Sequence, residues 1–192
     1  MPEKNTAALD FLLSRRSRPA KTLTTPVPGH DELRTILTAA ARSPDHGKLE
    51  PWRFIVLEGA ALQRLAGLVQ RRGEALGMDT AQIEKSVAQY RDAALAVAVI
   101  SSPKPSEKIP AIEQVYSAGA ACLAMLNAAL ASGWGANWLT GWASRDEDFA
   151  GEGLGLKPGE SVAGMIHIGT ETSPPPERPR PDLDAITTWV SQ

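Results

Sequence analysis

The residues best suited to chemistry near the start of the chain are Arg15, Arg16, Ser17 and Arg18, which follow a predicted short helix. Guanidinium groups bind phosphate oxygens through paired N–H donors, and a neighbouring hydroxyl adds a further hydrogen bond. The segment therefore suits a phosphate site. A solvated cationic end that complements the helix dipole explains the same residues without a ligand. Taken alone, the segment favours this second interpretation.

A second polar segment covers residues 43–54, with the sequence Ser-Pro-Asp-His-Gly-Lys-Leu-Glu-Pro-Trp-Arg-Phe. Its neighbours Asp45 and His46 could suggest acid–base chemistry, but adjacent side chains seldom face each other productively. No serine or cysteine nucleophile stands in a recognisable motif nearby, which argues against a hydrolase. A single histidine in a loop is most often a surface residue that makes hydrogen bonds.

A third segment, residues 135–142, places Trp138 and Trp142 beside short polar groups. This combination suits a flat ring ligand, although a tryptophan-rich core explains it equally simply and is favoured for the segment alone. The three histidines are far apart in sequence and there is one cysteine, so no metal site is predicted. The glycines at 133 and 135 lack the third glycine and the preceding strand of a dinucleotide fingerprint.

Composition indicates an ordinary globular protein. The chain has 192 residues and a net charge of −2, which suits one domain and predicts neither a nucleic acid nor an anionic membrane as partner. The lone Cys122 excludes an intrachain disulfide, and residues 1–16 show no signal-peptide pattern, so we expect a cytoplasmic protein. Residues 115–144 carry no charged side chain, but Gly133 and Gly135 interrupt them, which favours a buried helix and strand over a membrane span.

The elements that must position these segments follow from hydrophobic periodicity. The order lacks regular β-α-β alternation, which predicts an α+β fold of two or three layers. A helix that is apolar on every side must be covered on every side, so helix 112–132 lies either at a subunit interface or in the core of a monomer. The proline-rich tail after Thr170 is either disordered or an arm that reaches a second subunit. The predicted helices are 6–13, 31–41, 60–76, 80–91 and 112–132, and the predicted strands are 52–57, 95–100, 136–139 and 162–168.

Three segments in this order and spacing resemble the nitroreductase family: residues 15–17, residues 43–56 and the strand Gly-Met-Ile-His-Ile-Gly at 164–169. The chain length and the Pro-Asp-His variant resemble the minimal branch of that family. The resemblance implies an α+β, three-layer fold with a central, mostly antiparallel sheet flanked by helices, in an intertwined homodimer. It also implies one domain over residues 1–192, in which residues 171–192 form an arm that packs on the partner subunit.

The resemblance further implies two FMN sites at the dimer interface. The opening arginines and serine would hold the phosphate, the ribityl chain and the ring edge, while the segment after the small-residue helix would line the ring. A cation pair near the C-terminus, Arg178-Pro-Arg180, would complete the phosphate site. The implied FMN residues are Arg15, Arg16, Ser17, Trp138, Leu139, Thr140 and Arg180 from one chain, with Arg42 and His46 from the other.

The implied reaction is a ping-pong transfer of hydride from NAD(P)H, through FMN, to a small organic acceptor such as a nitroaromatic or a quinone. Because the cofactor supplies the chemistry, no dedicated catalytic side chain is required, and none is predicted. Two alternatives stay open: a flavin enzyme of the same fold with another reaction, such as dehalogenation or ring desaturation, and a flavin-binding module without turnover.

The sequence departs from the family pattern at three positions. Many members place a cation against the N1/O2 edge of the flavin where this chain has Pro19. Many also have asparagine where Lys48 stands and glutamine where Glu50 stands. A positive charge near N1/O2 stabilises the reduced ring, so we expect Arg42 to replace the missing cation.

Overall fold

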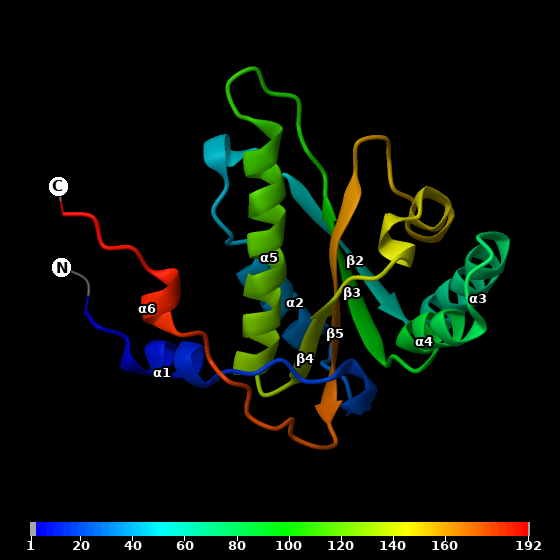
Figure 1. Cartoon of the computed structure of the whole chain (residues 1–192), viewed down its shortest axis with the longest axis horizontal. Helices are drawn as coiled ribbons and strands as arrows, with labels where there is room; N and C mark the ends of the chain where they lie inside the picture. The colour runs from blue at the N-terminus through cyan, green and yellow to red at the C-terminus, as the bar shows by residue number, and fades with distance from the viewer. Residues whose placement is uncertain (1–2, 192) are drawn as a thin grey trace.

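The structure, a computed structural model, describes residues 3–191, which form a mixed array of helices and strands (Figure 1). Each predicted helix and strand is present, with its ends within a few residues of the prediction. The elements are α1 (Thr6–Ser14), β1 (Leu23–Thr24), α2 (His30–Ala40), β2 (Trp52–Glu58), α3 (Gly59–Ala75), α4 (Thr80–Arg91), β3 (Leu95–Ser101), α5 (Ala111–Ala131), β4 (Gly135–Leu139), β5 (Ser161–Glu171) and α6 (Leu183–Ile186).

The sheet is antiparallel throughout the described pairs. Strand β3 lies between β2 and β5, and the far edge of β5 pairs first with β4 and then, near its end, with β1. Every residue of β3 is buried, as expected for a continuous apolar run at the centre of a covered sheet. Helices α2 and α5 cover one face and α3 and α4 the other (Figure 1), which confirms the three-layer α+β prediction.

The two faces of the sheet have separate cores because side chains alternate along β3. Val97 and Val99 point to the α2/α5 side, where they pack with Met125 of α5. Ala98 and Ile100 point to the α3/α4 side. Beside this second core, Arg72 in the last turn of α3 forms ion pairs with Asp146 and Asp148.

Helix α5 is the one described helix that is long and apolar enough to span a membrane by length and composition. It instead packs against α2 and the sheet, and 44% of its most apolar window is buried within a single chain. Four large apolar side chains on its other side are exposed: Ile112, Val115, Tyr116 and Leu123. A single chain therefore buries only part of α5, although the composition of this helix predicts that every side is buried.

The sequence patterns missed β1 and the last part of β5. Strand β1 has two residues and lies in the segment 22–29, whose prolines indicated a loop. Strand β5 continues to Glu171, beyond the predicted end at Ile168, because β1 pairs with Thr170 and Glu171. A Cβ added at Gly169 would stand 2.7 Å from the carbonyl oxygen of Thr24, so glycine permits this close pairing.

Candidate functional site

An open cleft lies where the N-terminal segment and the C-terminal segment meet β4. Its volume is about 840 Å³. We call it the arginine cleft. It brings together Arg15, Arg16, Ser17, Trp138 and Arg180, five of the residues predicted for FMN. The lining is completed by Pro19, Asn137, Pro175, Arg178, Pro179 and Pro181.

Backbone and side-chain hydrogen bonds fix the N-terminal wall of the cleft to β4. Helix α1 ends at Ser14, and the N–H of Arg15 still donates to the carbonyl of Phe11 at 2.8 Å. The N–H of Arg18 donates to the carbonyl of Ala136 at 2.8 Å, and Asn137 Nδ2 donates to the carbonyl of Arg18 at 2.6 Å. The segment 15–18 is therefore bonded at both ends, to α1 through Arg15 and to β4 through Arg18.

The cations of the cleft have more donors than the described chain can satisfy. Arg15 Nη2 donates to Ser17 Oγ at 3.1 Å, and Arg16 Nη2 donates to the carbonyl of Pro176 at 3.0 Å. The Nε atoms of both arginines are buried and have no hydrogen-bond partner within residues 3–191. Neither arginine forms an ion pair with a described carboxylate, whereas Arg180 has one, at 3.2 Å, with Glu177.

The surroundings of Arg15 destabilise its charge. Burial lowers the pKa of the Arg15 guanidinium, and the nearby charges of Arg180 and Arg16 lower it further. Placing several cations together away from water costs free energy unless an anion or several hydrogen-bond acceptors accompany them. The arrangement therefore favours an anionic ligand with several oxygen acceptors, as a phosphate has.

Arg18 is excluded from this cationic cluster by a carboxylate. Its Nε lies 3.2 Å from Glu171 Oε2, at the end of β5, and its side chain is not among those that line the cleft. The cation next to Pro19 is therefore already neutralised within the chain.

The aromatic side of the cleft is formed by Trp138 in β4. Trp138 Nε1 donates to the carbonyl of Ala163 at 3.3 Å, and the indole lies directly over Gly164 of β5, where an added Cβ would collide with the ring. Leu139, the last residue of β4, pairs with Met165. Thr140 follows the strand and is exposed. Neither Leu139 nor Thr140 belongs to the cleft lining.

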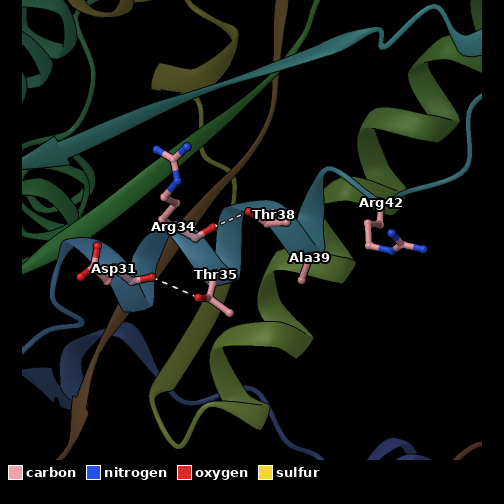
Figure 2. A pocket seen from close by; sticks show the side chains of 6 residues that line it. All are labelled: Asp31, Arg34, Thr35, Thr38, Ala39 and Arg42. Atoms are coloured by element: carbon pink, nitrogen blue, oxygen red, sulfur yellow. Dashed lines mark hydrogen bonds between the residues drawn. The ribbon is translucent and has the colours of Figure 1, made fainter.

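The other two predicted FMN residues lie away from the arginine cleft. Arg42 follows α2 and is exposed. Figure 2 shows it beyond the C-terminal end of the helix, on a shallow surface where Thr35 and Thr38 donate to backbone carbonyls one turn earlier. His46 Nδ1 lies 2.8 Å from Glu113 Oε2 of α5. The resemblance assigns Arg42 and His46 to the flavin of the other chain.

Two features of the cleft were not found from the sequence. The amide of Asn137 fixes the arginine segment, and its place beside Trp138 in a polar motif was the available signal. The proline walls at 175–181 lie in a segment whose composition gave no indication of contact with residue 16. Arg178, which the resemblance paired with Arg180, also lines the cleft.

Comparisons with known proteins agree with this geometry. The family described as "Nitroreductase family" matches residues 12–170. YdjA of Escherichia coli strain K12, provisionally named an NAD(P)H nitroreductase, is 34% identical over 163 residues, which cover 85% of this chain and 87% of YdjA.

Two solved structures show the same fold. The nitroreductase-like family protein from Bacillus cereus has a TM-score of 0.80 at 20% identity, covering 99% of both chains. A provisionally named nitroreductase from Desulfovibrio desulfuricans, solved in complex with FMN, has a TM-score of 0.72 at 22% identity, covering 98% of this chain and 99% of that one. With a family match over most of its length and a relative above 30% identity, this chain belongs to the nitroreductase family.

Proposed function

We propose that this protein binds FMN with the help of the arginine cleft and transfers hydride from NAD(P)H to small organic acceptors, such as nitroaromatics or quinones, in ping-pong order. The observation that carries the proposal is the cationic cluster of Arg15, Arg16 and Arg180 beside the indole of Trp138, in which the buried Nε atoms of Arg15 and Arg16 have no hydrogen-bond partner within residues 3–191. The family, the name of its relative YdjA and the FMN bound to a structural neighbour support the cofactor and the reductant.

The residues of the cleft fit such a cofactor. Arg15, Arg16 and Arg180 would bind a phosphate through charge-assisted hydrogen bonds, and Ser17 adds a hydroxyl. Trp138, held against Gly164, offers an apolar surface at the side of a flat ring. Bound flavin supplies the redox chemistry, so the protein contributes binding, orientation and charge. The proline residues at 175, 179 and 181 line the same cleft opposite the arginine segment.

The direct test is the absorption spectrum of the purified protein, followed by denaturation. We expect a yellow protein that releases FMN and that oxidises NADH or NADPH when a nitroaromatic or a quinone is supplied. A colourless protein that takes up no FMN on titration would contradict the proposal. NAD(P)H consumption without reduction of either acceptor would instead favour another reaction of the same fold.

The proposal includes a homodimer in the cytoplasm. Among the described residues, exposed apolar side chains gather on α1, on α5 and along the C-terminal arm (residues 171–192), where Trp189 is 89% exposed. In the view of Figure 1, helices α1 and α6 lie on the same side of the molecule, away from the sheet. A second copy would cover these surfaces, and the arm would pack on it, because contiguous exposed apolar side chains mark an interaction site.

We expect light scattering at micromolar concentration to give about twice the chain mass of 20.5 kDa. Replacing Ile186 and Trp189 with serine should shift the protein toward the monomer, because both side chains are exposed in the single chain and have no core contact to lose. The matched control is Ser191→Ala on the same arm. A parent protein that is monomeric and retains FMN would contradict both the dimer and the two-chain site.

We also expect Arg42 of the partner subunit to supply the positive charge at the N1/O2 edge. Arg42→Ala should lower the flavin reduction potential and weaken FMN binding at least tenfold, since a hydrogen bond to a charged group contributes about 1.5 kcal/mol or more. Arg18→Ala should leave the potential unchanged, because Arg18 is paired with Glu171. A redox titration of both variants beside the parent decides the matter. A shift in Arg18→Ala alone would place the cation in the same chain.

A further inference from the structure

We propose that Glu113 is a positioning residue that holds the imidazole of His46 with its Nε2 edge free to bind the flavin across the dimer interface. The proposal rests on the proposed function and on the assignment of His46 to the flavin of the other chain, which the family resemblance implies. It is carried by one contact between residues far apart in sequence: His46 Nδ1 and Glu113 Oε2 are 2.8 Å apart.

The backbones on both sides of this contact are fixed. Glu113 lies in the first turn of α5, where the helix dipole favours a carboxylate. One turn later, Ser117 Oγ donates to the carbonyl of Pro44 at 2.7 Å and accepts from Trp52 Nε1 at 3.1 Å. Exposed ion pairs are generally weak because two flexible side chains must be ordered. Here the loop and the helix are already joined, so less freedom is lost.

The loop that carries His46 has an unusual backbone. Lys48 and Glu50 adopt positive φ values of 56° and 49°, which residues other than glycine rarely do. Asp45 holds this conformation, because its Oδ1 accepts the N–H groups of Leu49 and Glu50. Such backbone strain persists where the surroundings enforce it and is concentrated at ligand sites. The loop is therefore preformed, and Glu113 sets the one imidazole that projects from it.

The carboxylate determines where the imidazole keeps its proton. With Glu113 as acceptor, Nδ1 of His46 carries a proton whether the ring is neutral or charged, and the ring plane is set by that bond. In the neutral ring Nε2 is then a hydrogen-bond acceptor. It can accept from a hydroxyl or a ring N–H, both of which FMN offers. Without the carboxylate, the proton is free to occupy either nitrogen.

The position of the pair fits an interface. In the single chain the His46 side chain is 62% exposed and the Glu113 side chain 44% exposed. Glu113 is flanked on α5 by the exposed apolar residues Ile112, Val115 and Tyr116. A second copy that covers these residues would remove water from the pair, and the hydrogen bond from the imidazole to the carboxylate is electrostatically stronger in a medium of lower dielectric constant.

The test is a double-mutant cycle of FMN affinity. The affinity is measured by titrating the cofactor-free full-length protein with FMN and monitoring the flavin fluorescence. Glu113→Gln keeps the shape of the side chain and removes its charge. We expect Glu113→Gln and His46→Ala each to weaken FMN binding about fivefold to tenfold, in the range of one hydrogen bond. Because Glu113 acts through His46, Glu113→Gln should change the affinity less than about twofold in the His46→Ala background. Glu107→Gln, a nearby exposed carboxylate without an ion pair within residues 3–191, is the matched control.

A second measurement reports the positioning itself. The ¹⁵N chemical shifts of His46 at neutral pH should show the proton on Nδ1 in the parent and a mixture of tautomers in Glu113→Gln. Equal, additive losses in the cycle, or an unchanged tautomer, would overturn the proposal. A parent protein that binds no FMN contradicts the proposed function, whereas a parent that binds FMN and shows additive variants contradicts the role of Glu113 alone.

Discussion

Replacing Arg15 and Arg16 together with alanine is expected to abolish FMN binding at micromolar concentration. Each arginine would bind the phosphate through charge-assisted hydrogen bonds, worth about 1.5 to 3 kcal/mol apiece. The two losses together correspond to an affinity reduced about 10²- to 10⁴-fold. Equilibrium titration of the cofactor-free protein with FMN measures this reduction directly.

The same double variant should be at least as stable as the parent in the absence of FMN. Arg15 is destabilised by burial and by the charges of Arg180 and Arg16, and the buried Nε atoms of Arg15 and Arg16 lack partners. Removing the two cations relieves this repulsion, so the melting temperature without cofactor should stay level or rise. Arg145→Ala, which removes an exposed arginine outside the cleft, controls for charge. A fall in stability together with unchanged FMN affinity would show that the arginines are structural.

Acid is expected to destabilise the fold through His167. This residue of β5 is 2% exposed, and its Nε2 has no hydrogen-bond partner in the described part of the chain. Burial lowers the pKa of His167 from 6.5 to about 4. Between these pH values the unfolded chain binds a proton that the folded chain does not, so stability falls as the pH drops. The lowered pKa corresponds to about 3 kcal/mol, which is lost progressively as the pH falls from 6.5 through 4.

Urea unfolding of the parent and of His167→Gln at pH 7.5, 6, 5 and 4.5 measures this contribution. The variant cannot titrate at position 167, so its free energy of unfolding should fall less steeply with pH than that of the parent, even if it is lower at pH 7.5. His30→Gln, at an exposed position on α2, controls for the loss of an imidazole. Parallel curves for the parent and His167→Gln would contradict the assignment.

The sequence predicted the elements whose periodicity extends over several turns or a whole strand. The apolar run of β3 and the small-residue stretch of α5 were found within one residue at each end. It did not predict β1, because a strand of two residues has no periodicity to detect and forms only where Thr170 and Glu171 are available as partners. Long-range pairing, rather than local preference, decides such an element.

For the site, too, the local sequence indicated the residue types but not which segments come together. The types of Arg15, Arg16 and Trp138 suggested an anion and a ring, but each segment alone favoured a simpler interpretation. Only the resemblance to the family placed them together, and the structure brings them to one cleft with Arg180. The roles of Leu139 and Thr140, which lie outside the cleft lining, and of Arg42 and His46 stay predictions, because a single chain does not contain the surface that the last two would meet.

The arginine cleft joins the two ends of the chain, with Arg15 and Arg16 on one wall and Pro175 to Pro181 on the other. During synthesis the first wall leaves the ribosome long before the second, because the bonded residues Arg16 and Pro176 are 160 positions apart. A chain that stops before residue 175 would retain the whole described sheet but lack one wall of the cleft. Under the proposed function, such a chain would bind FMN more weakly than one that extends through residue 181, so cofactor binding would discriminate against truncated chains.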